Sequence, residues 1–159
     1  MKIKGITDEC FGDYKKAAMY IAMPYCSFKC DKENGTQLCQ NWELTTAPTI
    51  TINNKELIER YLNNPITEAI IFSGLEPLDS FTEIYCFIKE LRLRGCNDDV
   101  VIYTGYNKDE VFNDAYKPLF YLKNIYVKFG RFRPNEEAHY DEVLGVKLAS
   151  SNQYAEKLS

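Results

Sequence analysis

The stretch MPYCSFKCDKENGTQLCQNWEL, residues 23–44, places three cysteines in one loop directly after a short apolar run. Thiolates on a loop bind soft metals well, because sulfur is polarisable and a bending backbone can bring several ligands together. A structural zinc site usually closes with four protein ligands. Three ligands, Cys26, Cys30 and Cys39, would leave one position of a metal cluster open for chemistry, so the count of three favours a reactive centre.

The spacing of these cysteines leaves other interpretations open. Cys10 or His139 would complete a structural zinc site, and three free thiols are the simplest alternative. His139 is the only histidine and lies among acidic residues, which is typical of a surface position. Cys86 falls inside a long helical pattern and Cys96 just beyond it. Both are expected to belong to the core rather than to a metal site.

Composition sets the class of protein. The chain has 159 residues with a formal net charge of -4, so we expect one domain, 1–159, and no nucleic-acid surface. Apolar residues make up 45% of the chain and aromatic residues 14%, which predicts a packed core. No apolar run is long enough to span a membrane, and the N-terminus lacks the pattern of a signal peptide. We therefore expect a cytoplasmic protein, in which clustered cysteines indicate metal or redox chemistry rather than disulfides.

Apolar runs alternate with helical patterns along the chain. Four runs predict buried strands, namely 17–23, 68–72, 100–103 and 125–129, and residues 1–16 predict a short edge strand. The expected helices run from an Asn53 or Asn54 cap through Leu62, from an Asp79 or Ser80 cap to a last turn with Arg92 and Arg94 that Gly95 can end, and from an Asn107 cap through Phe112. Helical spacing predicts apolar faces made by Leu57, Ile58, Tyr61 and Leu62 in the first helix and by Phe81, Ile84, Tyr85, Ile88 and Leu91 in the second. This order predicts an α/β fold with a mainly parallel sheet of βαβ units. The carboxyl ends of all four strands would then meet at one rim, where ligands bind in such sheets.

The loops at that rim resemble the motifs of one family in the correct order. Cys26 and Cys30, followed by Cys39-Gln-Asn, resemble the C-x3-C-x2-C signature of radical S-adenosylmethionine (radical SAM) proteins. Residues 73–78, SGLEPL, resemble their S-G-G-E-P-L segment. Residues 103–106 (YTGY), 127–132 (VKFGRF) and 150–153 (SSNQ) resemble segments of the activating proteins of anaerobic ribonucleotide reductase. The resemblance covers about residues 19–153.

Three departures from the family pattern stand out. Eight residues separate Cys30 from Cys39 where the family has two, so residues 31–38 form an insertion, for which Asn34-Gly35 predicts a hairpin-like turn. Leu75 replaces a glycine, and a positive φ there would strain it. Phe129 stands where the family has an acid, with Lys128 before it. Arg131 would serve a carboxylate or an interface, although an exposed arginine is the simpler reading.

The resemblance implies a partial (β/α) barrel of the radical SAM type and two cofactors, a 4Fe-4S cluster and S-adenosylmethionine (SAM). Cys26, Cys30 and Cys39 would hold the cluster, and no catalytic residue beyond these ligands is expected. The implied SAM contacts come from the three loops that follow the first three strands: Leu38, Gln40, Ser73, Gly74, Leu75, Glu76, Thr104 and Gly105.

The activity implied by the resemblance is that of a radical SAM activating enzyme. It would cleave SAM reductively and generate a glycyl radical on a partner, the large subunit of anaerobic ribonucleotide reductase. A flavodoxin or ferredoxin would supply the electron. Two alternatives remain: a radical SAM enzyme acting on another protein, peptide or small molecule, or a metal-stabilised binding or regulatory module without SAM chemistry.

Overall fold

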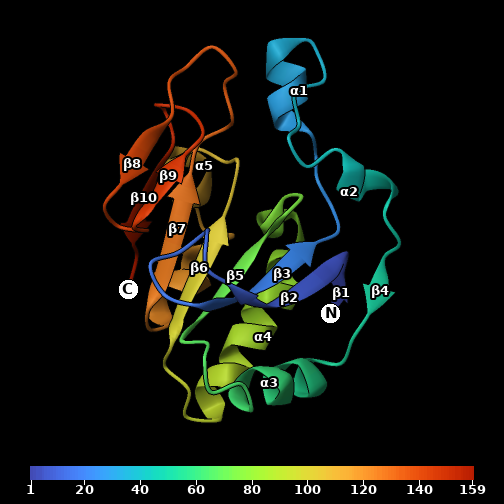
Figure 1. Ribbon diagram of the computed structural model, residues 1–159, viewed down its shortest axis with the longest axis vertical. Helices are drawn as coiled ribbons and strands as arrows, with labels where there is room; N and C mark the ends of the chain where they lie inside the picture. Colours follow the sequence, from blue (N-terminus) through green and yellow to red (C-terminus); the bar gives the residue numbers. More distant parts are fainter.

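Six strands form one mixed sheet in the order β10-β7-β6-β5-β3-β2 (Figure 1). The structure is a computed structural model and describes residues 1–159. The central strands are β3 (Ala18–Met23), β5 (Ala69–Gly74), β6 (Asp99–Tyr103) and β7 (Ile125–Phe129). They pair in parallel, and nearly all of their residues are buried. The four predicted strands and the α/β class are therefore confirmed.

The two edges of the sheet are antiparallel. On one side β2 (Gly5–Cys10) pairs with β3, with an irregular register between Thr7 and Cys10, and the predicted edge strand is confirmed. On the other side β10 (Tyr154–Lys157) pairs with β7. The two edge strands do not pair with each other, so the strand pairing forms an open mixed sheet. The barrel geometry that the resemblance implies is not found.

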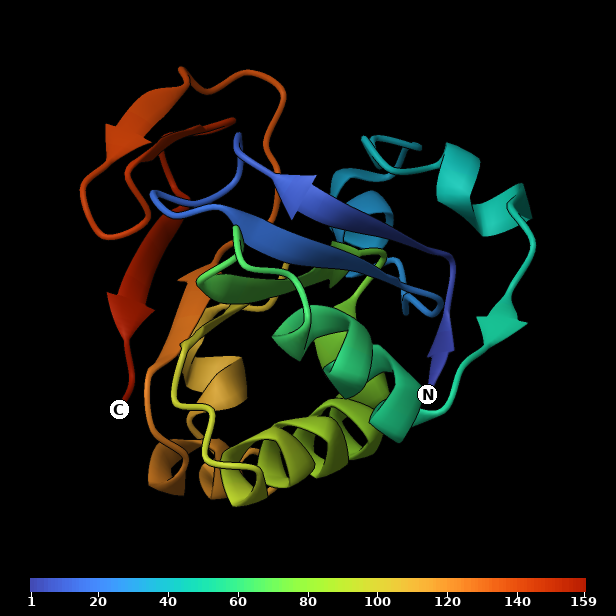
Figure 2. The ribbon, with the colours of Figure 1, turned by 60° about the horizontal axis from the view of Figure 1, so that its bottom comes forward.

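Two helices cover one face of the sheet (Figure 2). These are α3 (Asn54–Leu62) and α4 (Phe81–Leu93). The face of α4 that is buried comprises Ile84, Phe87, Ile88 and Leu91, and the Phe87 ring packs edge-on against that of Phe72 at 5.5 Å. Helical spacing predicted Tyr85 on this face, but Phe87 takes its place. Leu62, also expected to be buried, is 44% exposed because the helix ends there.

The starts of the three predicted helices fall at the expected residues. The Asn53 side chain caps α3 by accepting a hydrogen bond from the Lys55 N–H. Asn107 and Glu110 form a reciprocal capping box at α5 (Lys108–Val111). Ser80 stands at the N-cap of α4, one of the two expected positions, but its side chain makes no capping hydrogen bond, because a 3₁₀ turn, η1 (Pro77–Ser80), leads directly into that helix.

The second face of the sheet carries a smaller core. It includes Tyr14, Val101 and Tyr126 from the sheet side, with Leu144 and Leu148 packed over them. The last two residues belong to the hairpin of β8 (His139–Asp141) and β9 (Val146–Leu148), which the sequence did not predict. This face is less completely covered than the first, and it leaves space near the carboxyl ends of the strands.

The remaining elements are short. They are β1 (Lys2–Ile3), which pairs with β4 (Ile50–Thr51), then α1 (Lys29–Asn34), α2 (Glu43–Thr46) and η2 (Lys117–Tyr121). Cys86, expected in the core, is exposed on α4, because it faces away from the sheet. None of the helices combines the length and apolar character that crossing a bilayer requires.

Candidate metal and cofactor site

The three cysteines of the loop after β3 line one cavity of about 320 Å³ at the carboxyl ends of the parallel strands. Cys26 follows the end of β3, Cys30 lies in the first turn of α1, and Cys39 comes after that helix. All three are free and half-buried. The insertion therefore returns Cys39 to the cavity, although as a helix ended by Gly35 rather than as the predicted hairpin-like turn.

Burial raises the pKa of each thiol, that of Cys26 to about 12. The neighbouring thiols contribute, since the charge of Cys30 raises the pKa of Cys26 and that of Cys39 raises the pKa of Cys30. Thiols of this kind stay protonated in the free protein and lose their protons when a metal binds. Thiols with raised pKa values are weak nucleophiles in the metal-free protein.

No three His, Cys, Asp or Glu side chains converge closely enough to share a single metal ion. This includes Cys10, whose thiol donates to the Asp13 carboxylate at 3.0 Å, and His139, which lies on the β8–β9 hairpin. The structure therefore shows no ligand set for the alternative zinc site. A four-iron cluster is wider than one ion, so its thiolates must stand further apart around a common cavity. The donor set of three thiols in one cavity fits such a cluster.

Gly74 shapes the wall of the cavity beside the cysteines. Its φ is +87°, and a Cβ there would lie 2.8 Å from the Met23 N and 2.9 Å from the Ala22 Cα. Only glycine meets both conditions. Leu75 next to it has no positive φ, so the expected strain at the substituted glycine is absent. The loop is further tied to the cysteine loop, because the Asn41 side chain donates to the Gly74 carbonyl at 2.5 Å.

Glu76 joins two of the sequence motifs from a buried position. Its carboxylate accepts hydrogen bonds from the Thr104 hydroxyl (2.7 Å), the Gly105 N–H (2.8 Å) and the Leu78 N–H (3.0 Å). Desolvation raises its pKa to about 7, although these three hydrogen bonds act to lower it. The Thr104 hydroxyl also accepts from the Tyr106 N–H, so both of its roles are already filled within the protein. Thr104 and Gly105 therefore hold Glu76 as well as lining the cavity.

Lys128 is the one buried cation among the lining residues that were not predicted for the site. It is 7% exposed, lines the same cavity, and its ammonium donates to the carbonyls of Gly130 (2.8 Å) and Thr104 (3.5 Å). No carboxylate lies within ion-pair distance, and burial lowers its pKa to about 8. A lysine in the otherwise apolar run 125–129 is a signal that could have identified it.

Arg131 is not the exposed residue that the sequence suggested. Only 4% of it is exposed, and its guanidinium forms a two-point ion pair with the Glu110 carboxylate at 2.7 and 2.9 Å. The pKa of Glu110 is lowered to about 2, chiefly by this hydrogen bonding to Arg131. The predicted turn at 150–153 is present, and the Gln153 side chain within it accepts from the Ala149 and Ser150 N–H groups.

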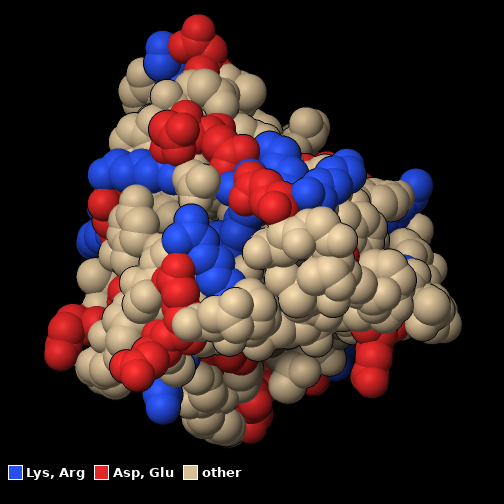
Figure 3. Space-filling view, turned by 90° about the horizontal axis from the view of Figure 1, so that it is seen from above, with Lys and Arg blue, Asp and Glu red and all other residues tan.

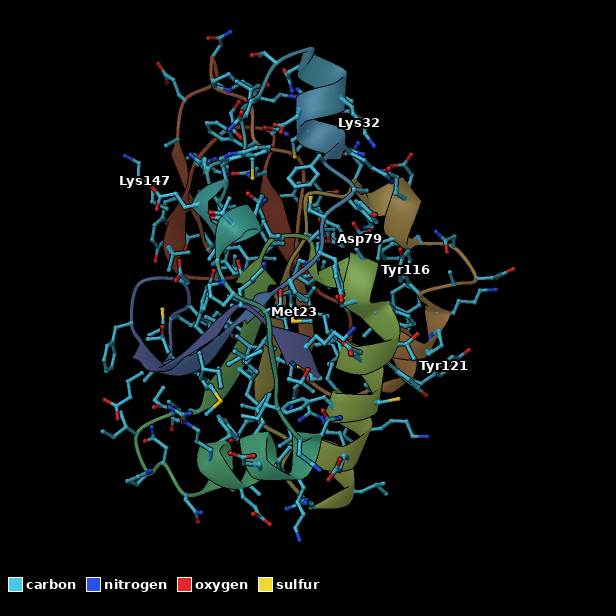
Figure 4. All side chains as sticks on the ribbon, turned by 90° about the vertical axis from the view of Figure 1, so that its right-hand side faces the viewer. Met23, Lys32, Asp79, Tyr116, Tyr121 and Lys147 are labelled. Carbon is cyan, nitrogen blue, oxygen red and sulfur yellow. The ribbon has the colours of Figure 1, made fainter.

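Every site residue predicted from the sequence lies at this cavity. The lining includes Cys26, Cys30, Leu38, Cys39, Gln40, Ser73, Gly74, Leu75, Glu76, Thr104 and Gly105. Residues not predicted for the site complete it, among them Asp13, Tyr20, Tyr103, Lys128 and Gln153. Figure 4 shows Lys147, a further lining residue, at the upper left of the view, with α1 at the top and Asp79 below it.

An α/β sheet with three thiols at the carboxyl ends of its strands is an arrangement that fits an iron–sulfur centre. The family described as "4Fe-4S single cluster domain" matches residues 12–154, which is most of the chain, and the chain belongs to this family. A 4Fe-4S cluster is accordingly its cofactor. No match was found among curated proteins or among solved structures.

Proposed function

We propose that this protein is a radical SAM enzyme whose cluster is held by Cys26, Cys30 and Cys39. The observation that carries the proposal is the shared cavity, which brings the three thiols together with the segments 73–76 and 104–105. Cys26, Cys30 and Cys39 would hold the cluster as its three protein ligands, which would leave one iron available to SAM. When bound, the cluster supplies the single electron that breaks the sulfonium C–S bond, giving methionine and a 5′-deoxyadenosyl radical.

The residues of this chain have two tasks in that reaction. The wall from Ser73 to Glu76 orients the methionine part of SAM, and Lys128 offers a buried cation without an acidic partner to its carboxylate. A charge-assisted hydrogen bond of this kind is stronger than a neutral one, and more so in a cavity screened from water. The electron comes from a one-electron donor of the flavodoxin or ferredoxin type.

We further propose that the radical removes a hydrogen atom from a glycine of a partner enzyme, anaerobic ribonucleotide reductase being the first candidate. The products are 5′-deoxyadenosine and a glycyl radical, so atoms and electrons balance. The motifs YTGY and SSNQ support this narrower assignment. The cavity is at the small end for a ligand pocket. A cavity of this size leaves little room for a second small substrate beside the cofactors, which favours a substrate that approaches from outside.

Anaerobic reconstitution with iron and sulfide, followed by incubation with SAM and dithionite, tests the proposal. We expect a 4Fe-4S spectrum and release of 5′-deoxyadenosine. Cys39→Ala should lose both, whereas Cys86→Ala, a change of the same kind at an exposed thiol, should keep both. Addition of the reductase subunit should then give the electron paramagnetic resonance (EPR) doublet of a glycyl radical. A cluster without SAM cleavage would instead identify a metal-stabilised module.

A further inference from the structure

The insertion in the cysteine loop forms a helix that has no core of its own. α1 consists of six residues, none of them buried, and Figure 1 shows it projecting above the sheet. A helix of this length is unstable in isolation, because too few hydrogen bonds offset the cost of nucleation. Its position must therefore depend on polar contacts with the rest of the protein.

Two ion pairs hold the outer side of α1. The Lys29 ammonium lies 2.9 Å from the Glu110 carboxylate and sits over the Tyr106 ring at 3.9 Å. The Arg131 Nε lies 3.1 Å from the Glu33 carboxylate. Figure 3 shows acidic and basic side chains interleaved at this end of the molecule. One partner in each pair is at least partly open to solvent, which limits the free energy that the pair contributes. Both pairs act on α1 itself, and neither contacts the segment that follows the helix.

Asp31 fixes that following segment. One oxygen of its carboxylate accepts hydrogen bonds from two backbone groups, the N–H of Leu38 at 2.8 Å and that of Cys39 at 3.1 Å. Asp31 directly follows Cys30, so a single side chain connects the second cysteine with the third. Hydrogen bonds to an ionised acceptor are roughly twice as strong as neutral ones.

We infer that Asp31 is a positioning residue that holds Cys39 at the cavity before the cluster is bound. The inference rests on the proposed role of Cys39 as a ligand. Without this contact the segment from Gly35 to Cys39 would be an open loop, and the cost of ordering it would fall on cluster binding.

Hydrogen exchange on the reduced, metal-free protein tests the geometry independently of the cofactor. In Asp31→Ala we expect the amides of Leu38 and Cys39 to exchange about tenfold faster, as for the loss of one hydrogen bond. Asp31→Asn keeps an uncharged acceptor and should be intermediate. Lys32→Ala is the matched control, because Lys32 is exposed on the same helix (Figure 4) and its side chain forms no hydrogen bond or ion pair. Unchanged exchange in Asp31→Ala would overturn the inference.

Reconstitution of the same variants tests the consequence for the cluster. We expect Asp31→Ala to bind less iron and sulfide per chain and to give an altered EPR signal on reduction. Asp31→Asn should recover part of the wild-type signal, and Lys32→Ala all of it. A full cluster with an unchanged signal in Asp31→Ala would refute the positioning role and leave the proposed function intact. If the wild type itself binds no cluster, the proposed function fails, and hydrogen exchange still decides whether Asp31 holds the loop.

Discussion

At the scale of single residues, the cavity depends on side chains whose polar partners come from distant parts of the chain. Glu76 shows how far sequence carries the argument. The SGLEPL motif identified Glu76 as a site residue. Its position just after an apolar run predicted that it lies at the carboxyl ends of the strands. Its burial and its three donors, two of them from residues 104–105, arise only when β5 and β6 pair. Lys128 was missed for the same reason, since its missing counter-charge is a property of the fold.

Replacing Lys128 tests its proposed contact with the SAM carboxylate. Loss of one charge-assisted hydrogen bond costs about 1.5–3 kcal/mol, so Lys128→Met should raise the Kd for SAM about 10- to 100-fold. Equilibrium binding to the reconstituted protein measures this value. Lys147→Met is the matched control, because Lys147 lines the same cavity but is exposed. An unchanged Kd in Lys128→Met would remove Lys128 from the binding site.

The raised pKa of Glu76 predicts an unusual dependence of stability on pH. In the unfolded chain this carboxyl ionises near 4.5, whereas in the folded protein it keeps its proton up to about pH 7. The folded state therefore binds more protons across this window, and stability falls as pH rises through it. A difference of this size corresponds to about 3 kcal/mol.

Urea unfolding of the metal-free protein measures this effect. The free energy of unfolding of the wild type, relative to Glu76→Gln, should fall by about 3 kcal/mol between pH 4.5 and 7. The exposed Glu137, changed to Gln, should leave the pH profile of the wild type unaltered. Parallel profiles for the wild type and Glu76→Gln would show that Glu76 ionises normally in the folded protein.

At the scale of elements, the pairing of Glu110 with Arg131 joins α5 to the segment after β7 and offers α1 its contact point. The capping box at α5 was legible in the sequence, because Asn107 and Glu110 stand at the required spacing. The helix α1 could not be predicted from the sequence, because it buries no side chain and therefore shows no hydrophobic periodicity. Asn34-Gly35 was predicted to form a hairpin-like turn. The chain does turn there, but the turn is the C-terminal end of α1, with Gly35 as its C-cap.

Glu110→Gln tests this junction. The change leaves the buried Arg131 without its charged partner, so we expect a loss of about 2 kcal/mol of stability at pH 7. The pKa of Glu110 is lowered to about 2 in the folded protein, so its contribution is complete above about pH 4.5 and disappears as pH falls toward 2. The difference in urea midpoint between the wild type and Glu110→Gln should shrink across that window. The neighbouring exposed Asp109, changed to Asn, should show no such trend.

At the scale of the whole molecule, the sequence predicted the parallel centre of the sheet better than its periphery. The central strands are continuous apolar runs, a pattern typical of buried parallel strands. The βαβ connections between them determine that they run in the same direction. The strand β10 has one buried residue, Ala155, and β8 and β9 have three residues each. Such short strands form because another strand is available to pair with them, so the residues within each strand carry too little pattern to predict it. Their placement completes the cavity wall through Lys147, Leu148 and Gln153.

The distribution of the six free cysteines over the molecule gives a final prediction. Cys86 is exposed on the helical layer, whereas Cys26, Cys30 and Cys39 are half-buried with raised pKa values. Alkylation by iodoacetamide requires an accessible thiolate, so in the metal-free protein Cys86 should react before these three. Mass spectrometry of peptides after timed labelling measures each rate.

Cluster assembly should then increase the difference in labelling rate between Cys86 and the three cavity cysteines. The three cavity thiols become protected by bonding to iron, while the rate at Cys86 stays the same because it lies on the far side of α4 from the sheet. Cys10 and Cys96 serve as internal controls, since both are half-buried but neither lines the cavity. If Cys39 labels equally fast with and without the cluster, it is not a ligand, and the third coordinating group must come from elsewhere in the cavity.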